Sequence, residues 1–368
     1  MSGNRDVLEA VVRHAALLDD DDIAQALDAL TTCADVSLVP RLHEALVRFL
    51  DDRNFYGRDL IPRVLAGIQG VAALPALLGA SARDIGDDQD SLQAEIIVLL
   101  QADPEQARRT VLAFAIGNAP ELRRVGLWAL GFVAGAQDLD LLAAAASDAD
   151  PAIRSVAVGS IPGPVGDDRA FGMVADALGD LEEQVRVSAA SKLGFTGRRD
   201  AVPPLASLVT DRAPRVRSMA AWALGHLGRA EAAGPLLRLL RDLHDHVREQ
   251  AVRALGAVGG PVAVDALLAL AAEEDPLRRA QAARALATAA GTDPRVWPQV
   301  MMLARDHEAG VRAATLSGTA SLQPERAQLV AGLADDPDPV VRRRVAVTAR
   351  HLAPDAARDI LTRYARDR

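Results

Sequence analysis

The chain has 368 residues, of which 50% are apolar but only 3% aromatic, and it carries a net charge of −9. Such a composition suits helices that pack closely through small side chains and argues against a sheet-rich fold. The single cysteine, Cys33, excludes an internal disulfide and fits a reducing cytoplasm, and we expect neither a leader at Met1 nor an apolar run long enough to span a bilayer.

The negative charge is concentrated in the first part of the chain. Residues 1–100 contain 17 Asp and Glu against 8 Arg, which gives −9, whereas residues 101–368 contain 33 of each sign. An acidic surface repels phosphate backbones and attracts basic proteins. The charge distribution therefore disfavours nucleic acid as a ligand and favours a basic protein partner.

Residues 1–58 are predicted to form an acidic helical cap, with helices over 5–18, 23–33 and 39–50. Within it, Phe49, Phe55 and Tyr56 place three of the eleven aromatic residues in eight positions. We interpret DDRNFYGRD (51–59) as a loop that turns at its glycine. Aromatic and arginine side chains in a loop are typical of binding hot spots.

This loop gives the first predicted partner-binding residues, which are Arg53, Phe55, Tyr56 and Arg58. An alternative is that Phe55 only closes the end of the helical array. A second acidic loop over 84–90 adds Asp87 and Asp88 to the predicted partner surface. That loop lacks the ligand spacing and closing glutamate of a calcium site, so we expect no metal there.

A Val-Arg or similar pair marks a repeat through the rest of the chain. The arginine recurs every 30 to 33 residues, at Arg123, Arg154, Arg186, Arg217, Arg248, Arg279, Arg312 and Arg342. A steady period of this length is typical of a solenoid. We expect degenerate repeats over 59–118 and regular repeats with a C-terminal cap over 119–368. Pro162 and Pro164 should end one helix early.

Within one repeat, Val216, Ala220 and Leu224 form an apolar helical stripe that ends near Gly225 and Gly228, where the chain needs positive φ. A second, shorter helix follows around 232–240. The sequence therefore predicts an all-α fold, a right-handed α-solenoid of about ten two-helix repeats of about 31 residues.

The repeat resembles the HEAT-like repeat family, especially the short repeats of the phycobilin-lyase type. The stretches that carry this resemblance are VRSMAAWALGHLG (216–228), VREQAVRALGAVG (247–259), VRVSAASKLGFTG (185–197) and LRRVGLWALGFVA (122–134). The resemblance implies a scaffold whose second helices line a concave face. It does not specify one function, because this scaffold serves many.

Two further features concern the surface. The recurring arginines lie near boundary aspartates, as Arg217 does to Asp211, which favours ion pairing between repeats over a phosphate-binding stripe. Trp128 and Trp222 occupy one register where another repeat has Arg253, so this position is expected to be partly exposed.

The last predicted partner-binding residues are Trp297 and Met301, beside Arg305. We place them on the concave face, where Met and Trp suit protein recognition; alternatively, they fill a gap between stacked helices. The pair His244 and His246 lacks a third metal ligand in register.

We therefore expect no catalytic residue, cofactor or metal. The predicted function is a non-catalytic, cytoplasmic scaffold or adaptor that binds a protein on its curved surface, or a bacterial immunity protein that neutralises a basic toxin. The alternative is an enzyme on the same scaffold, either a phycobilin-type lyase or a DNA glycosylase.

Overall fold

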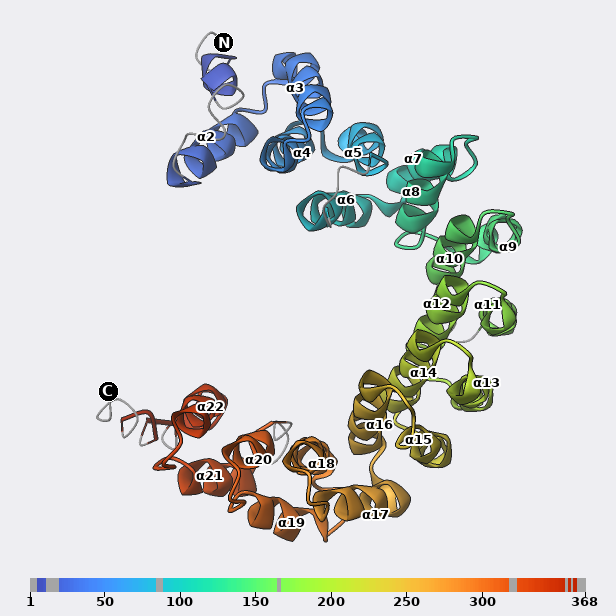
Figure 1. The fold of residues 1–368 in the computed structure, drawn as a ribbon. Coiled ribbons are helices and arrows are strands. Elements are labelled where there is room, and N and C mark those ends of the chain that lie inside the picture. The colour runs from blue at the N-terminus through green and yellow to red at the C-terminus, as the bar shows by residue number, and fades with distance from the viewer. Residues whose placement is uncertain are drawn as a thin grey trace. The chain divides into compact units, whose positions relative to one another are not determined.

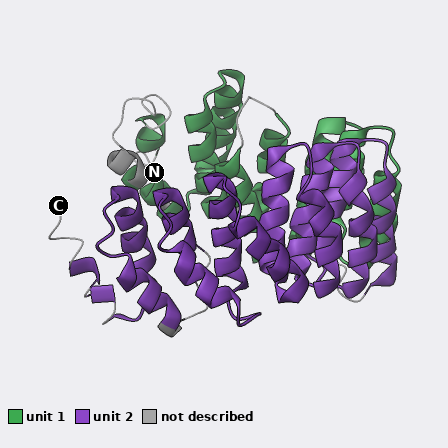
Figure 2. Ribbon diagram, turned by 60° about the horizontal axis from the view of Figure 1, so that its bottom comes forward, with its two compact units in different colours: residues 1–164 green, residues 165–368 purple. Residues whose placement is uncertain are grey.

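The computed structural model describes residues 5–10, 20–83, 89–163, 167–317, 323–354, 357–358 and 360–362. These residues contain helices and no strand, which confirms the predicted all-α fold. The chain divides into two compact units, which we call the N-terminal unit (1–164) and the C-terminal unit (165–368) (Figure 2). The predicted division at residues 58 and 118 stays a prediction.

The N-terminal unit is built from antiparallel helices joined by short loops. Its helices are α2 (Asp20–Cys33), α3 (Val39–Asp51), α4 (Phe55–Gln69), α5 (Leu74–Ser81), α6 (Asp90–Ala102), α7 (Pro104–Ala115), α8 (Pro120–Leu130), α9 (Leu139–Ala146) and α10 (Pro151–Ser160). Helices α2 and α3 match two of the three helices predicted for the cap. Of the third, residues 5–10 are helical and 11–19 lie outside the described residues. The helix α10 ends before Pro162, as predicted.

One helical stretch, Phe55–Ser81, is long and apolar enough to cross a membrane by length and composition alone. It is not one straight helix, because Gly70, with φ +56°, separates α4 from α5. Helix α4 packs against α3 and α6, and α5 packs against α6. Burial in the core of this unit accounts for the apolar composition of the stretch.

The C-terminal unit continues the same pattern with greater regularity. Its helices are α11 (Asp168–Asp176), α12 (Glu183–Gly194), α13 (Val202–Ser207), α14 (Pro214–Leu227), α15 (Ala233–Leu239), α16 (Asp245–Val258), α17 (Gly260–Ala271), α18 (Pro276–Ala289), α19 (Val296–Leu303), α20 (Ala309–Thr315), α21 (Gln323–Gly332) and α22 (Pro339–Ala349).

Within the C-terminal unit the helices form two rows (Figure 1). The inner row consists of α12, α14, α16, α18, α20 and α22, and the outer row of α11, α13, α15, α17, α19 and α21. The Val-Arg helices thus form the inner row, and each packs directly on the next. Helix α17 packs more extensively on α18 than on α16. The helix taken from sequence as the second of each pair therefore lies on the outer side, which corrects its predicted place on the concave face.

Small residues let neighbouring inner helices approach closely. Ala220 and Ala223 on α14 are fully buried. Gly228, with φ +60°, ends α14 as predicted, but Gly225 has another role. A methyl group on Gly225 would lie 2.7 Å from the Cα and Cβ of Ala254 on α16. Gly225 is therefore required for helix contact rather than for positive φ.

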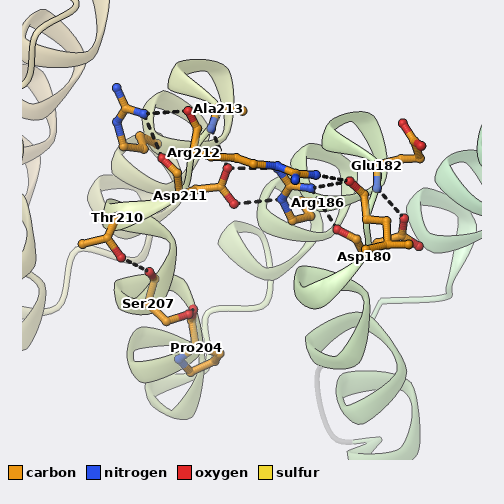
Figure 3. Close-up of polar contacts among 11 residues, drawn as sticks. Asp180, Glu182, Arg186, Pro204, Ser207, Thr210, Asp211, Arg212 and Ala213 are labelled. Carbon is orange, nitrogen blue, oxygen red and sulfur yellow. Dashed lines mark hydrogen bonds and ion pairs between the residues drawn. The ribbon is translucent and has the colours of Figure 1, made fainter.

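An arginine–aspartate ladder joins the repeats of the C-terminal unit. Arg186 donates from Nε and Nη2 to the two carboxylate oxygens of Asp211, at 2.8 and 2.9 Å, and from Nη1 to the carbonyl oxygen of Asp180 at 2.8 Å (Figure 3). The same Asp211 accepts the backbone N–H of Ala213 at the start of α14. Arg186 thus connects two successive loops and holds the aspartate that accepts the N–H of Ala213, the N-cap residue of the next inner helix.

The ladder recurs with nearly constant geometry at the pairs Arg217–Asp242, Arg279–Asp306 and Arg312–Asp336. The prediction of ion pairing between repeats is confirmed, with one correction. Arg217 is ion-paired with the carboxylate of Asp242 in the following loop. To Asp211, the aspartate named from sequence, it donates only at the backbone carbonyl oxygen. The arginines are thereby occupied within the fold.

Candidate protein-interaction surface

Three ring side chains gather on the inner row of the C-terminal unit, and we call Phe195, Trp222 and His226 the inner aromatic patch. The Phe195 ring lies 5.1 Å from Trp222 and 5.0 Å from His226, edge to face in both cases. Trp222 and His226 are stacked at 5.1 Å. Phe195 is 61% exposed, His226 is exposed and Trp222 is half-buried.

The repeat itself creates this patch. Trp222 and His226 lie five and nine residues after Arg217, a spacing of four that places them on one helical face. Phe195 lies nine residues after Arg186, so it reaches the same level from α12. In the N-terminal unit the same two positions hold Trp128 and Phe132, whose rings lie 5.3 Å apart. Trp128 and Trp222 are both half-buried, which confirms the predicted partial exposure.

A cavity of about 410 Å³ lies beside the patch, between α14 and α16. Trp222 and His226 form one wall, and Gln250 and Arg253 form the other. The Arg253 guanidinium is held by Glu249 at 2.8 Å on its own helix. An aromatic wall next to an arginine suits the apolar anchor side chain of a protein partner.

The predicted site at residues 51–59 differs from the expected loop. Helix α3 ends at Asp51, and Asn54 caps α4 by accepting the backbone N–H of Gly57. Phe55 and Tyr56 lie in the first turn of α4 and are 42% and 40% exposed. Gly57 makes no turn; it packs against the Phe49 ring, which a methyl group would overlap at 2.5 Å.

The two arginines of that predicted site differ in their exposure. Arg58 is 1% exposed and ion-paired to Asp59 at 2.6 Å, so its assignment as a partner contact is wrong. A buried arginine is held by its carboxylate and is not available to a ligand. Arg53 is exposed, in the left-handed conformation with φ +51°, and stays a prediction with Phe55 and Tyr56. Asp87 and Asp88 lie outside the described residues.

The predicted cluster of Trp297, Met301 and Arg305 is on and just after α19, in the outer row. Trp297 and Met301 are half-buried, and Arg305 is exposed. Trp297 lines a cavity of about 370 Å³ with Pro294 and Glu325. Helix α19 lies in the outer row, which corrects the predicted place of these residues on the concave face, and their role in partner binding stays a prediction.

The described part of the chain contains no cluster of side chains that could bind a metal ion, because no group of three or more His, Cys, Asp or Glu there is placed to hold one. The rings of His244 and His246 lie 5.8 Å apart, and His244 lies 3.4 Å from the Asp242 carboxylate, which the ladder already uses.

Of the three residues of the inner aromatic patch, only Trp222 was predicted from sequence to be exposed, and Phe195 and His226 were not. A usable signal was present, because ring residues recur nine residues after the marker arginine at Phe132, Phe195 and His226. A search by repeat position, rather than by local clustering of aromatic residues, would have found them.

Comparisons with known proteins bear on the repeat and on the fold. A sequence profile for HEAT repeats matches residues 173–246 and 224–287, and no curated protein matches the chain. Kap95p, solved with RanGDP, has a TM-score of 0.52 at 14% identity over 95% of this chain and 55% of its own. Kap121p has a TM-score of 0.50 at 14% identity over 94% and 45%.

The complex of CpcE and CpcF of phycocyanin lyase from Nostoc sp. PCC7120 is 20% identical over 61% of this chain and 93% of that chain, with a TM-score of 0.41. The chain spans about half the length of Kap95p and Kap121p. Together, the repeat profile and the solenoid structures show a protein that resembles the HEAT-like repeat family and folds as an all-α solenoid.

Proposed function

We propose that this chain is a non-catalytic scaffold that binds a partner protein through the inner aromatic patch. The observation that carries the proposal is the exposure of Phe195, 61%, beside Trp222 and a cavity of about 410 Å³. Exposed aromatic side chains that border a cavity are the usual anchors of protein interfaces. The solenoid fold supports this role, since Kap95p, a solenoid of the same kind, binds RanGDP.

We further propose that the partner is basic, because residues 1–100 carry a net charge equal to that of the whole chain. A cytoplasmic location is part of the proposal and fits the single cysteine. Long-range attraction between opposite charges accelerates association and weakens as salt is added. Both an assembly adaptor and an immunity protein that neutralises a basic toxin fit this description. A copurifying chromophore would instead indicate the lyase alternative, and copurifying DNA the glycosylase.

The test is affinity capture from cells of the source organism with the full chain as bait, at low and at high salt. The variant Phe195→Ala/His226→Ala removes two exposed rings and should keep the wild-type circular dichroism spectrum. We expect the captured protein to fall by roughly tenfold or more, as for loss of interface anchors. Val262→Ala, which alters an exposed outer-row residue, is the matched control.

A further pair, Phe55→Ala/Tyr56→Ala, tests the predicted N-terminal site in the same assay. Loss of the partner with this pair and retention with Phe195→Ala/His226→Ala would move the binding surface to α4. Capture of the partner at the wild-type level by both double variants would contradict both proposed sites.

A further inference from the structure

A second cavity, of about 640 Å³, lies between the outer helices α15 and α17 of the C-terminal unit. Its floor is apolar and includes Leu237, Leu240 and Leu270. This volume falls within the range of specific ligand sites, about 300–1,000 Å³, and accommodates a few side chains rather than a folded domain.

The rim of this cavity is strongly basic. Arg238, Arg241 and Arg278 line it with one acid, Glu273, so three positive charges face one negative charge. Glu273 lies 3.4 Å from Arg278 and is occupied by it. Within the described ranges, the side chains of Arg238 and Arg241 have no hydrogen bond or ion pair, and both residues are exposed.

The rim coincides with an interruption of the arginine–aspartate ladder. At the other steps of the C-terminal unit described above, the arginine binds an aspartate of the following loop. The position 25 residues after Arg248 holds Glu273 instead, which lines the cavity. Arg248 pairs with Asp245 and donates to the carbonyl oxygen of Asp242. Among the described residues, the arginine–aspartate ion pair between successive loops is therefore missing at the repeat that borders the cavity.

Ordinary helix electrostatics explains only part of this basic rim. Arg238 lies in the last turn of α15, where a cation complements the helix dipole. That effect does not account for Arg278, which comes from the first turn of α18 and lines the same cavity. In a chain of net charge −9, three guanidinium groups at one cavity favour an anionic ligand.

We propose that this cavity docks an acidic and apolar segment of a partner protein. A leucine-sized side chain occupies the floor, and neighbouring carboxylates pair with Arg238 and Arg241. Guanidinium groups bind carboxylates through two parallel hydrogen bonds, which gives orientation as well as affinity. The site is on the outer row and does not depend on the inner aromatic patch. The scaffold then presents two separate docking surfaces, one on each row.

The test uses the full chain and a phage-displayed random-peptide library as the probe. We expect the selected peptides to share a leucine or isoleucine flanked by Asp or Glu, and to bind more weakly at high salt. Arg238→Gln/Arg241→Gln should weaken the selected peptides by roughly tenfold or more in fluorescence polarisation. Arg215→Gln/Arg343→Gln removes equal charge from exposed positions of the inner row and should leave the affinity unchanged.

A second variant tests the cavity itself with its charges intact. Ala269 lines the cavity and is exposed, so Ala269→Trp should fill the space and abolish peptide binding without unfolding the protein. Phe195→Ala/His226→Ala should leave peptide binding intact, which separates failure here from failure of the inner patch.

Three results would overturn the proposal. Selected peptides could lack acidic residues, or they could bind Arg238→Gln/Arg241→Gln as tightly as the wild type. Displacement of the peptides by free decanoate, with loss of decanoate binding in Ala269→Trp, would assign the cavity to a small amphipathic carboxylate instead.

Discussion

At the scale of single residues, the ladder pair Arg217–Asp242 is the sharpest test of how the repeats hold together. Its side chains are 13% and 7% exposed, and Nε of Arg217 lies 2.6 Å from the carboxylate. Arg217→Ala would leave a largely buried carboxylate without its cation. We expect the free energy of unfolding to fall by about 2–4 kcal/mol, measured by urea denaturation.

The control for this change is Arg253→Ala on the next inner helix. Arg253 is 55% exposed and paired with Glu249 on the surface, so its loss should cost no more than about 0.5 kcal/mol. If both variants unfold alike, the ladder contributes no more than an ordinary surface ion pair.

At the scale of helices, the contact between α14 and α16 depends on Gly225. Gly225→Ala places a methyl group 2.7 Å from Ala254, and relief requires the two helices to separate. We expect a loss of about 1–3 kcal/mol in the free energy of unfolding, as for overpacked cores.

Gly172 in α11 provides the matched substitution. A methyl group there has no neighbour within 4 Å, so Gly172→Ala should stabilise the protein by up to about 1 kcal/mol through helix propensity. Thermal unfolding of both variants distinguishes the two effects. A stabilising Gly225→Ala would show that the inner helices are not in close contact.

At the scale of the whole molecule, the ladder makes stability depend on pH. The hydrogen bond from Arg217 lowers the pKa of Asp242 to about 2, and that from Arg312 lowers the pKa of Asp336. Burial raises the pKa values of Asp211 and Asp306, but hydrogen bonds from Arg186 and Arg279 and from backbone N–H groups outweigh it, so these also lie below the usual value.

Because these folded-state pKa values are depressed, the unfolded chain binds more protons in acid. The ladder's contribution is complete above the unfolded pKa of about 4 and is lost as pH falls towards about 2. We expect urea midpoints that are level from neutral pH to about 5 and then fall steeply. Asp242→Asn should fall less steeply in this range. An unchanged slope in that variant would contradict the proposed linkage.

The sequence alone determined the repeat, the all-α solenoid and the ion pairing between repeats. A period of 30 to 33 residues and an apolar stripe at helical spacing are local patterns, and stacking is the available way to bury such stripes. The helix ends at Gly228 and before Pro162 could also be predicted from sequence, because a single glycine or proline determines the backbone conformation there.

Only the tertiary structure decided which surfaces are available. Arg53 and Arg58 look alike in sequence, yet Arg58 is buried against Asp59 and Arg53 is exposed. The difference arises because α4 begins at Phe55, within the stretch that was predicted to be a loop. The row to which each helix belongs also depends on packing between helices distant in sequence. For that reason the inner aromatic patch, and the cavity where Glu273 interrupts the ladder, could be located only from the three-dimensional arrangement.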